Sequence, residues 1–384
     1  MSIRNVPWQG FAALVLVLLT AFSPAYTVQE LAALAPGESG SSYPYELSGP
    51  IMLGLAGLAA LAIVLRLRPA VEAAALFVLI HAAAWLLVGG IEGAAGGALA
   101  AYWYLLAALW LMAWRLATVL SSLKLSGRVA GTAIRLLVPA LFGAWILILW
   151  EAIVRGAGIP FILLPPPSAI GVRIAGSVPI LAADVYQTIF KAVLTGYVLG
   201  CASGFAVAIL ADRFLFLRRG LIPIGNMVSA LPIIGVAPIM VMWFGFDWQS
   251  KAAVVVIMTF FPMLVNTVAG LAASGHMERD LMRTYASSYT QTLTKLRLPA
   301  AAPFIFNALK INSTLALIGA IVAEFFGTPI VGMGFRISTE IGRMNVDMVW
   351  AEIAVAAVAG SVFYGVVALL ERAVTFWHPS IRGG

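Results

Sequence analysis

The segment Ala252–Leu271, AAVVVIMTFFPMLVNTVAGL, has no charged side chain. A helix needs about 20 mainly apolar residues to span the hydrocarbon core of a bilayer, so this segment predicts a membrane span. It is followed by a polar and basic stretch, His276–Pro299, which reads HMERDLMRTYASSYTQTLTKLRLP. A second apolar run, Ile311–Phe326, comes next. The polar stretch therefore predicts an element outside the membrane between two spans.

Apolar residues make up 62% of the chain and charged residues only 10%. A soluble domain usually has roughly 45–50% apolar and about 25% charged residues, so composition favours a polytopic membrane protein. Continuous apolar runs exclude a β-barrel, whose strands alternate in polarity. We expect an all-α fold with about ten spans, near residues 8–24, 50–66, 71–89, 98–120, 134–154, 186–211, 228–244, 252–271, 308–326 and 349–370.

Lys and Arg mark the cytoplasmic side of short loops. With the N-terminus inside, ten spans leave only Arg155, Arg173, Lys191, Lys251, Arg336 and Arg343 outside, so both termini and His276–Pro299 are expected in the cytoplasm. The net charge of +7 is then a topology signal, and no nucleic-acid partner is expected. The first apolar run is interpreted as an uncleaved anchor, although Ser23-Pro24-Ala25 also resembles a signal-peptide cleavage site.

Composition divides the chain into two sections. Residues 1–126 are rich in Ala, Leu and Gly, whereas residues 127–384 contain most of the prolines and polar interruptions. In the second section Gly196, Gly200 and Gly204 recur every fourth residue, which predicts close helix packing and offers one site for contact between two copies of the chain.

The polar stretch fits two short helices. Asp280, Arg283 and Ser287 share one helical face. Pro299 can begin the next helix because the first helical position needs no amide donor. An apolar side for packing against the bundle is offered by Leu293, Leu296 and Leu298.

This stretch resembles the cytoplasmic coupling loop of bacterial ABC-importer permeases, whose pattern is a Glu-Ala-Ala triplet, a later Gly and a Leu-Pro pair. Leu298-Pro299 matches the pair, Asp280-Leu281-Met282 takes the place of the triplet, and Ala286 replaces the Gly. Gly adopts positive φ at little cost and Ala does not. We therefore expect a turn that is tighter, shifted or helical here.

The resemblance covers about residues 135–380. Within this range the chain is similar to the branch of the family that imports nitrate, sulfonates, taurine and thiamine-type pyrimidines. The motifs that carry it are Leu164-Pro165-Pro166-Pro167-Ser168, Leu231-Pro232, Ala237-Pro238, Trp243-Phe244-Gly245, Phe261-Pro262, Asn266-Thr267, Ala323-Glu324 and Gly332-Met333-Gly334. Residues 1–126 are not part of this family pattern, which leaves them as an added N-terminal membrane section of four helices. Residues 127–384 are the expected permease core of about six helices.

The resemblance implies a permease pair surrounded by membrane lipid, two cytoplasmic ATPases and an external substrate-binding protein. The chain has no Gly-rich phosphate loop ending in Gly-Lys-Ser/Thr, so we expect it to bind no cofactor and ATP to be used by the partner subunit. No catalytic or metal site is predicted. By the resemblance, the residues that couple to the ATPase are Asp280, Arg283, Thr284, Ala286 and Ser287, with Leu298 and Pro299 linking to the next helix.

The substrate path is harder to place. Glu324 is the best candidate because an ionisable group in a span is costly unless it is paired or wet, but it is equally interpretable as a helix-end carboxylate at the interface. Asn312, Ser313 and Thr314 either line a polar face or bond to their own helix backbone.

The stretch 332–348 is amphipathic at helical spacing, with Ile337, Ile341 and Met344 on one side. The other side has Arg336, Glu340 and Arg343. The two arginines are candidates for docking the binding protein, and pore capping is the alternative.

Two classes of function stay open. The first is the permease subunit of an ATP-driven importer for a small organic solute. The second is a stand-alone, ion-coupled carrier, which usually has more buried charges than Glu324 provides. A membrane-embedded enzyme is a distant third because no cluster of catalytic residue types stands out. Within the resembling branch, a pyrimidine or another flat heterocycle is slightly favoured over taurine or nitrate.

Overall fold

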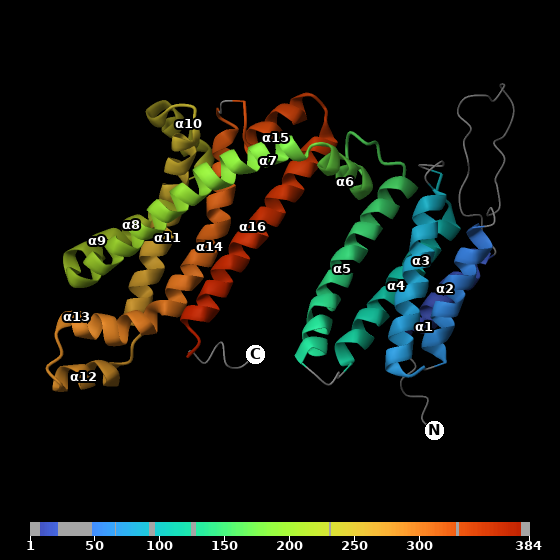
Figure 1. Cartoon of the computed structure of the whole chain (residues 1–384), viewed down its shortest axis with the longest axis horizontal. Coiled ribbons are helices and arrows are strands. Elements are labelled where there is room, and N and C mark those ends of the chain that lie inside the picture. The colour runs from blue at the N-terminus through green and yellow to red at the C-terminus, as the bar shows by residue number, and fades with distance from the viewer. Residues whose placement is uncertain are drawn as a thin grey trace. The chain divides into compact units, whose positions relative to one another are not determined.

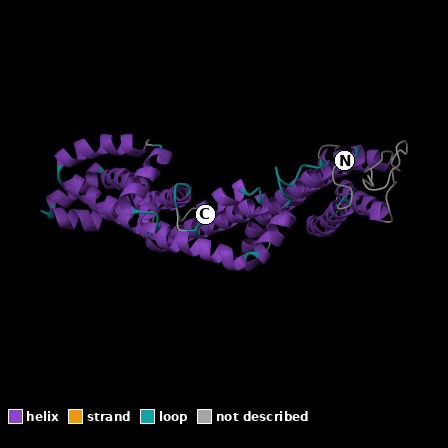
Figure 2. Cartoon of the chain, turned by 90° about the horizontal axis from the view of Figure 1, so that it is seen from above, coloured by secondary structure: helices purple, strands orange, loops and turns teal. Residues whose placement is uncertain are grey.

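The computed structural model describes residues 8–21, 48–65, 67–91, 97–123, 128–229, 232–327 and 330–377. Within these ranges the chain forms helices joined by short loops, and no β-strand is present (Figure 2). Seven of the described helices are long and apolar enough to cross a membrane. The all-α polytopic membrane fold is confirmed, whereas the count of about ten spans stays a prediction.

Some residues used in the sequence arguments lie outside the described ranges. They include the cleavage-site candidate Ser23-Pro24-Ala25, Leu231 of the first Leu-Pro pair, and part of the topology set. The topology residues concerned are Arg4, Arg66, Lys124 and Arg382.

The chain forms two compact units, Met1–Ile170 and Gly171–Gly384. The first unit contains α1 (Trp8–Ala21), α2 (Ser48–Val64), α3 (Pro69–Gly90), α4 (Ala100–Ser122) and α5 (Arg128–Gly156) (Figure 1). α4 packs against α1, α3 and α5. The domain boundary expected after residue 126 concerns membership of the permease core rather than packing, and it stays a prediction.

An ion pair that sequence reasoning did not foresee connects two helices of the first unit. Nε of Arg115 on α4 donates to Oε1 of Glu72 on α3 at 2.7 Å. The Glu72 side chain is 4% exposed. A buried carboxylate in an apolar bundle requires such a partner, so the pair fixes α3 beside α4.

The second unit is the one that carries the polar motifs. It begins within α6 (Pro167–Gly176), and its helices are α7 (Val178–Val185), the π-helical segment η1 (Tyr186–Val193), α8 (Leu194–Arg213), α9 (Leu215–Ser229), α10 (Ile233–Phe244), α11 (Trp248–Ala272), α12 (His276–Thr284), α13 (Tyr289–Thr292), the π-helical segment η2 (Leu293–Arg297), α14 (Leu298–Glu324), α15 (Met333–Gly342) and α16 (Val346–Val374). Its centre is α11, which packs against α8 and α14.

Glycines explain how closely α8 approaches α11. A Cβ on Gly196 would lie 2.6 Å from the carbonyl oxygen of Ala252, and one on Gly204 would lie 2.5 Å from the carbonyl oxygen of Phe260. Only glycine lets the two backbones meet at this spacing. The close packing expected from the glycine repeat is confirmed. The suggested use of the same face between two permease copies is wrong, because α11 already covers it.

The expected spans at 186–211 and 308–326 belong to longer helices. Candidate spans in the structure run over Val178–Arg213 and Tyr289–Glu324. The expected span at 228–244 is wrong in extent, because α10 begins only at Ile233 and has 12 residues. Pro232 precedes it, and a proline in the middle of a helix removes a backbone donor and clashes with the preceding turn.

Candidate functional site

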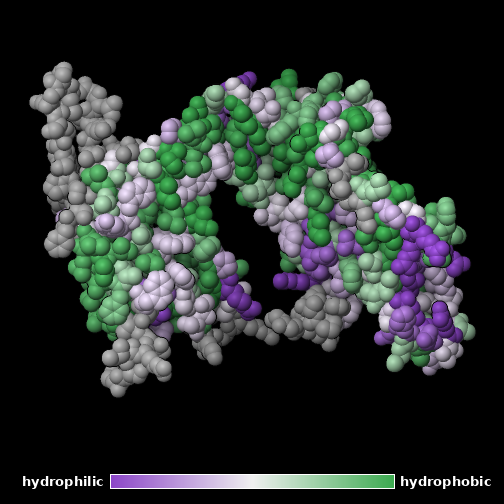
Figure 3. All heavy atoms as spheres, turned by 180° about the vertical axis from the view of Figure 1, so that it is seen from behind, coloured by the Kyte–Doolittle hydropathy of each residue, from purple (hydrophilic) through white to green (hydrophobic). Residues whose placement is uncertain are grey.

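The polar stretch 276–297, called the coupling arm below, lies at one end of α11 and α14, opposite the end where α7 and α15 lie (Figure 1). Its two short helices, expected from the sequence, are α12 and the run of α13 with η2. Hydrophilic side chains gather over α12 and α13 (Figure 3). Asp280 and Arg283 have side chains that are 69% and 83% exposed, so both are available to a partner.

An exposed apolar stripe runs along α12 and its C-terminal end. Met277, Leu281 and Tyr285 are 83%, 56% and 76% exposed. They are spaced four residues apart, so they form one face of the helix. Large apolar side chains at this spacing in a polar segment were the available sequence signal. The stripe lies beside the charged pair Asp280 and Arg283, whose 3.4 Å contact contributes little stability at such exposure.

The turn after α12 keeps a left-handed residue. The N–H of Ser287 donates to the carbonyl of Met282 at 3.0 Å, and the N–H of Ala286 donates to the carbonyl of Arg283 at 2.9 Å. These two bonds form a Schellman motif, which places a left-handed residue just beyond the helix cap. Ala286 takes that position with a φ of 50°. The expected tighter, shifted or helical turn is therefore wrong, because the two hydrogen bonds hold Ala286 in the conformation that the family Gly adopts easily.

The coupling arm is tied to the bundle at both of its ends. At the first end, the Arg279 guanidinium donates to the carbonyl of Ala272, the last residue of α11, and to that of Ser274, two residues later. At the second end, Leu293 is buried beside Leu271 and Leu298. The helix continues from Tyr289 to Glu324 without a gap. Leu298 and Pro299 thus begin α14 inside a continuous helix rather than after a break.

Glu324 lies in a buried network at the opposite end of the bundle. Its carboxylate accepts a hydrogen bond from the Thr188 hydroxyl at 2.8 Å and another from the Gly334 N–H at 2.7 Å. The Thr188 hydroxyl in turn accepts from the Met333 N–H at 2.9 Å. Glu324 is 1% exposed. The structure therefore places this carboxylate between α14, η1 and the start of α15, not on an open surface or at an exposed helix end.

The three polar residues of α14 do not share one face. The hydroxyls of Ser313 and Thr314 donate to carbonyls of their own helix. Asn312 is buried, and its amide donates to the carbonyl of Thr259 at 2.8 Å and to the sulfur of Cys201 at 3.2 Å. Asn312 therefore connects α14 with α11 and α8, while the two hydroxyls follow the backbone-bonding alternative.

The faces of α15 differ from the expected ones. The sequence placed Ile337, Ile341 and Met344 together on the apolar side of an amphipathic helix. In the structure Ile341 and Met344 are 55% and 64% exposed. The buried face contains Met333, Gly334, Ile337 and Glu340. Gly334 explains the difference, because the helix turns it toward α14, where a Cβ would lie 2.9 Å from Cβ of Glu324.

The two arginines assigned to α15 by the sequence have different surroundings. Nε of Arg336 donates to Oδ2 of Asp184 at 2.8 Å, and the Asp184 side chain is completely buried. This hydrogen bond raises the pKa of the Arg336 guanidinium above its ordinary value. Arg343 pairs with Glu340 at 3.2 Å and is 67% exposed. Arg343 is thus the arginine that a partner can reach.

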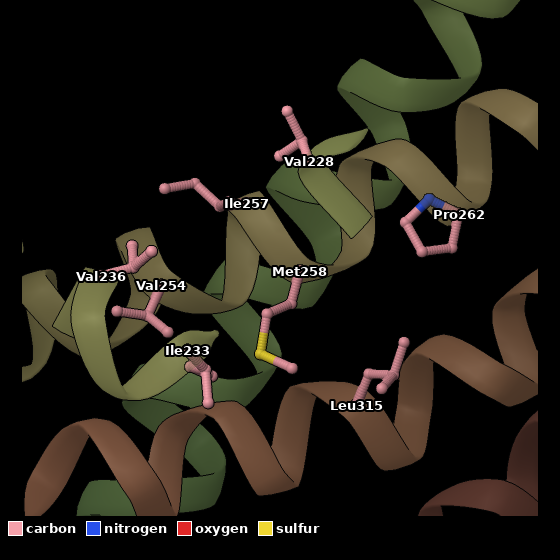
Figure 4. Close-up of a pocket in the computed structure, with 8 residues that line it drawn as sticks. All are labelled: Val228, Ile233, Val236, Val254, Ile257, Met258, Pro262 and Leu315. Carbon is pink, nitrogen blue, oxygen red and sulfur yellow. The ribbon is translucent and has the colours of Figure 1, made fainter. Parts of the chain in front are cut away.

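The second unit also contains a small apolar pocket that the sequence did not predict. Its volume is about 150 Å³. Val228 of α9, Ile233 of α10, Met258 of α11 and Leu315 of α14 point toward it (Figure 4). The described lining residues are all apolar, so the pocket offers shape but no side-chain hydrogen bond to a solute.

Together, the helical bundle, its exposed arm and the buried network at the far end define a membrane transport subunit. Residues 196–376 match the family model described as "Binding-protein-dependent transport system inner membrane component". The chain belongs to this family, and it is a permease component of a membrane transport system.

Relatives of known name support this membership. The chain is 30% identical to the formylaminopyrimidine transport permease protein ThiX of Halalkalibacterium halodurans over 246 residues, which cover 63% of this chain and 96% of the relative. It is 29% identical to the putative aliphatic sulfonates transport permease protein SsuC of Bacillus subtilis, covering 65% and 88%. It is 26% identical to the taurine transport system permease protein TauC of Escherichia coli, covering 62% and 89%. These relatives favour the permease subunit over a stand-alone carrier.

Proposed function

We propose that the coupling arm docks on a separate ATP-binding subunit and that ATP hydrolysis there drives uptake through this chain. The observation that supports this most is the exposed surface of α12, where Met277, Leu281 and Tyr285 lie beside Asp280 and Arg283. Exposed apolar side chains bordered by charge are typical of a protein interface. Thr284, Ala286 and Ser287 complete the end of this surface. No cofactor is bound by this chain in the proposal, because the nucleotide belongs to the partner.

The proposed transport cycle is alternating access between two states. Movement of α12 by the ATPases would reach α11 through the Arg279 contacts and α14 through the continuous helix that contains Leu298 and Pro299. Both the ATPase and a loaded binding protein must favour the same state in order to open the path outward. A pair of these permease chains, surrounded by lipid of the bacterial inner membrane, forms the path, with both termini in the cytoplasm.

The proposed solute is a small organic molecule delivered by an external binding protein. The relatives are named for a formylaminopyrimidine, aliphatic sulfonates and taurine. The apolar pocket beside Met258 supplies no polar ligand, in keeping with specificity that lies in the binding protein. Asn312, Ser313, Thr314 and Glu324 are retained as proposed path residues.

Docking of the binding protein is assigned to the end of the unit where α15 lies. Arg343 is the more accessible of the two candidates, while Arg336 contributes by holding α15 in place through Asp184. Capping of the path by α15 is the alternative role.

Charge reversal on α12 tests the ATPase interface. In Asp280→Lys or Arg283→Glu, we expect co-purification of the ATPase subunit and uptake of the three named solute types to fall by about tenfold or more, since a reversed charge at an interface costs several kcal/mol. The control is Lys295→Glu, which reverses an exposed charge on the same arm but outside α12. Membrane insertion should be unchanged in all three variants. Normal ATPase binding and uptake in the α12 variants would refute the docking assignment.

A further inference from the structure

Asp212 lies near the end of α8 and faces the coupling arm. Its side chain is 3% exposed. Both carboxylate oxygens accept from the Arg297 guanidinium, at 2.6 Å and 2.7 Å. A two-point contact between guanidinium and carboxylate fixes direction as well as distance. Arg297 is the last residue of η2, so the ion pair joins α8 to the root of the coupling arm.

Three further contacts converge on the same place. The Tyr289 hydroxyl donates to Oδ2 of Asp212 at 3.0 Å. Nε of Arg297 donates to the carbonyl oxygen of Leu271 at 3.0 Å. The Arg213 guanidinium lies over the Tyr289 ring, 4.8 Å from its centre. α8, α11, α13 and η2 therefore all contact one cluster, whose centre is the Asp212 carboxylate.

The cluster spans an irregular part of the helix that leads from the coupling arm into the membrane. Between Tyr289 and Arg297 the chain contains the π-helical segment η2, and Pro299 lies two residues after Arg297. Helices bend at π-helical segments and at prolines, because the regular backbone hydrogen bonds are interrupted there. Asp212 holds Tyr289 before η2 and Arg297 at its end. The carboxylate thus braces both sides of the place where this helix would otherwise bend.

The brace is attached to a closely packed pair of helices. α8 meets α11 through the glycine face, where a Cβ on Gly200 would lie 2.9 Å from the carbonyl oxygen of Val256. A buried ion pair adds little net stability compared with apolar packing, but it selects one geometry. Its location across η2 therefore indicates a mechanical role rather than a merely stabilising one.

We propose that Asp212 is a positioning residue that clamps the coupling arm to α8 and α11, so that displacement of α12 moves α8, α11 and α14 as one body. Without the clamp, the same displacement would be absorbed by bending at η2. The inference rests on the proposed docking of the ATPase at α12, but the clamp itself consists of contacts within this chain alone.

The test measures the distance between the coupling arm and α8. Spin labels are placed at Thr290→Cys, an exposed residue of the arm outside the proposed docking surface, and at Leu210→Cys. Both are introduced in a Cys201→Ser background, in the full chain purified with its ATPase and diluted with unlabelled chain. In the otherwise unchanged protein we expect one narrow distance distribution that stays the same when AMP-PNP and Mg²⁺ are added. In Asp212→Asn we expect the distribution to become at least twice as wide and to shift with AMP-PNP.

Glu371→Gln is the matched control. Glu371 accepts from Lys310 at 2.7 Å and ties α16 to α14, so the change removes an ion pair of similar length that does not contact the arm. In Glu371→Gln the distribution of distances between the two spin labels should stay narrow. If Asp212→Asn is as narrow as the parent, or if Glu371→Gln broadens equally, the clamp is refuted.

Milder variants keep the test decisive if Asp212→Asn fails to insert. Tyr289→Phe removes only the hydroxyl and should give an intermediate width, while Arg297→Lys keeps the charge but loses the two-point contact and should broaden more. Unchanged widths in both variants would also refute the clamp. Failure of the ATPase to co-purify with the parent protein would instead refute the proposed docking, because the distance widths without nucleotide report on the clamp alone.

Discussion

Replacing Ala286 with glycine should stabilise the coupling arm, which is unusual for a glycine substitution. Ala286 has a φ of 50°, and its N–H and that of Ser287 close the turn after α12. The left-handed conformation costs an ordinary residue roughly 1–2 kcal/mol. Glycine removes this cost but gives the unfolded loop more freedom, which offsets about 0.4–1 kcal/mol. The net gain is therefore about 0.5–1 kcal/mol.

Hydrogen exchange is the suitable assay because it measures local opening of the turn. A gain of about 0.5–1 kcal/mol corresponds to about two- to fivefold slower exchange at the amides of Ala286 and Ser287. Val in place of Ala286 should speed exchange by at least as much, since a β-branched side chain fits this conformation poorly.

Ala273→Gly provides the matched control. Ala273 is also exposed and also follows the end of a helix, but its φ is −76°, so glycine relieves no strain there. Exchange near Ala273 should be unchanged or faster. If Ala286→Gly speeds exchange in the turn, or if both glycine variants behave alike, the argument from backbone strain is wrong.

Two further predictions concern the second unit. Gly200→Ala would bring a Cβ to within 2.9 Å of the carbonyl oxygen of Val256. We expect it to lower the free energy of unfolding by about 1–3 kcal/mol, measured by thermal unfolding. Gly365 faces open space, so Gly365→Ala should not destabilise the protein. The two arginines at α15 should differ in how much stability is lost when each is replaced. Arg336→Met leaves the buried carboxylate of Asp184 without its ion-pair partner and should cost about 3–5 kcal/mol. Arg343→Glu should cost less than about 1 kcal/mol and instead weaken stimulation of ATP hydrolysis by the binding protein. Equal stability losses at the two arginines would contradict this assignment.

The coupling arm shows how far sequence reasoning extended. Its polar composition, the two short helices and the exposure of Asp280 and Arg283 were predictable, because charged residues between two apolar runs must lie outside the hydrocarbon. The left-handed Ala286 was not predictable from propensity, which disfavours it. Hydrogen bonds of the surrounding turn determined it instead.

The buried network around Glu324 shows the opposite limit. Glu324 was recognisable as an unusual ionisable group in a span, but its partners Thr188 and Gly334 are distant in sequence or on the next element. The same holds for Asp212, which was not a candidate at all because a carboxylate at a helix end is ordinary in a sequence. Its partners Tyr289 and Arg297 come 77 and 85 residues later.

The role in transport followed from the resemblance to a family. The sequence by itself determined that this protein is a helical membrane protein with a polar arm between two apolar spans. Those properties depend on local composition, because each span must be apolar along its own length and must satisfy its own backbone hydrogen bonds. Only the tertiary structure decided which charges meet, such as Asp212 with Arg297 and Asp184 with Arg336. A buried ion pair depends on the approach of helices that are far apart in the chain, and no local pattern encodes that approach.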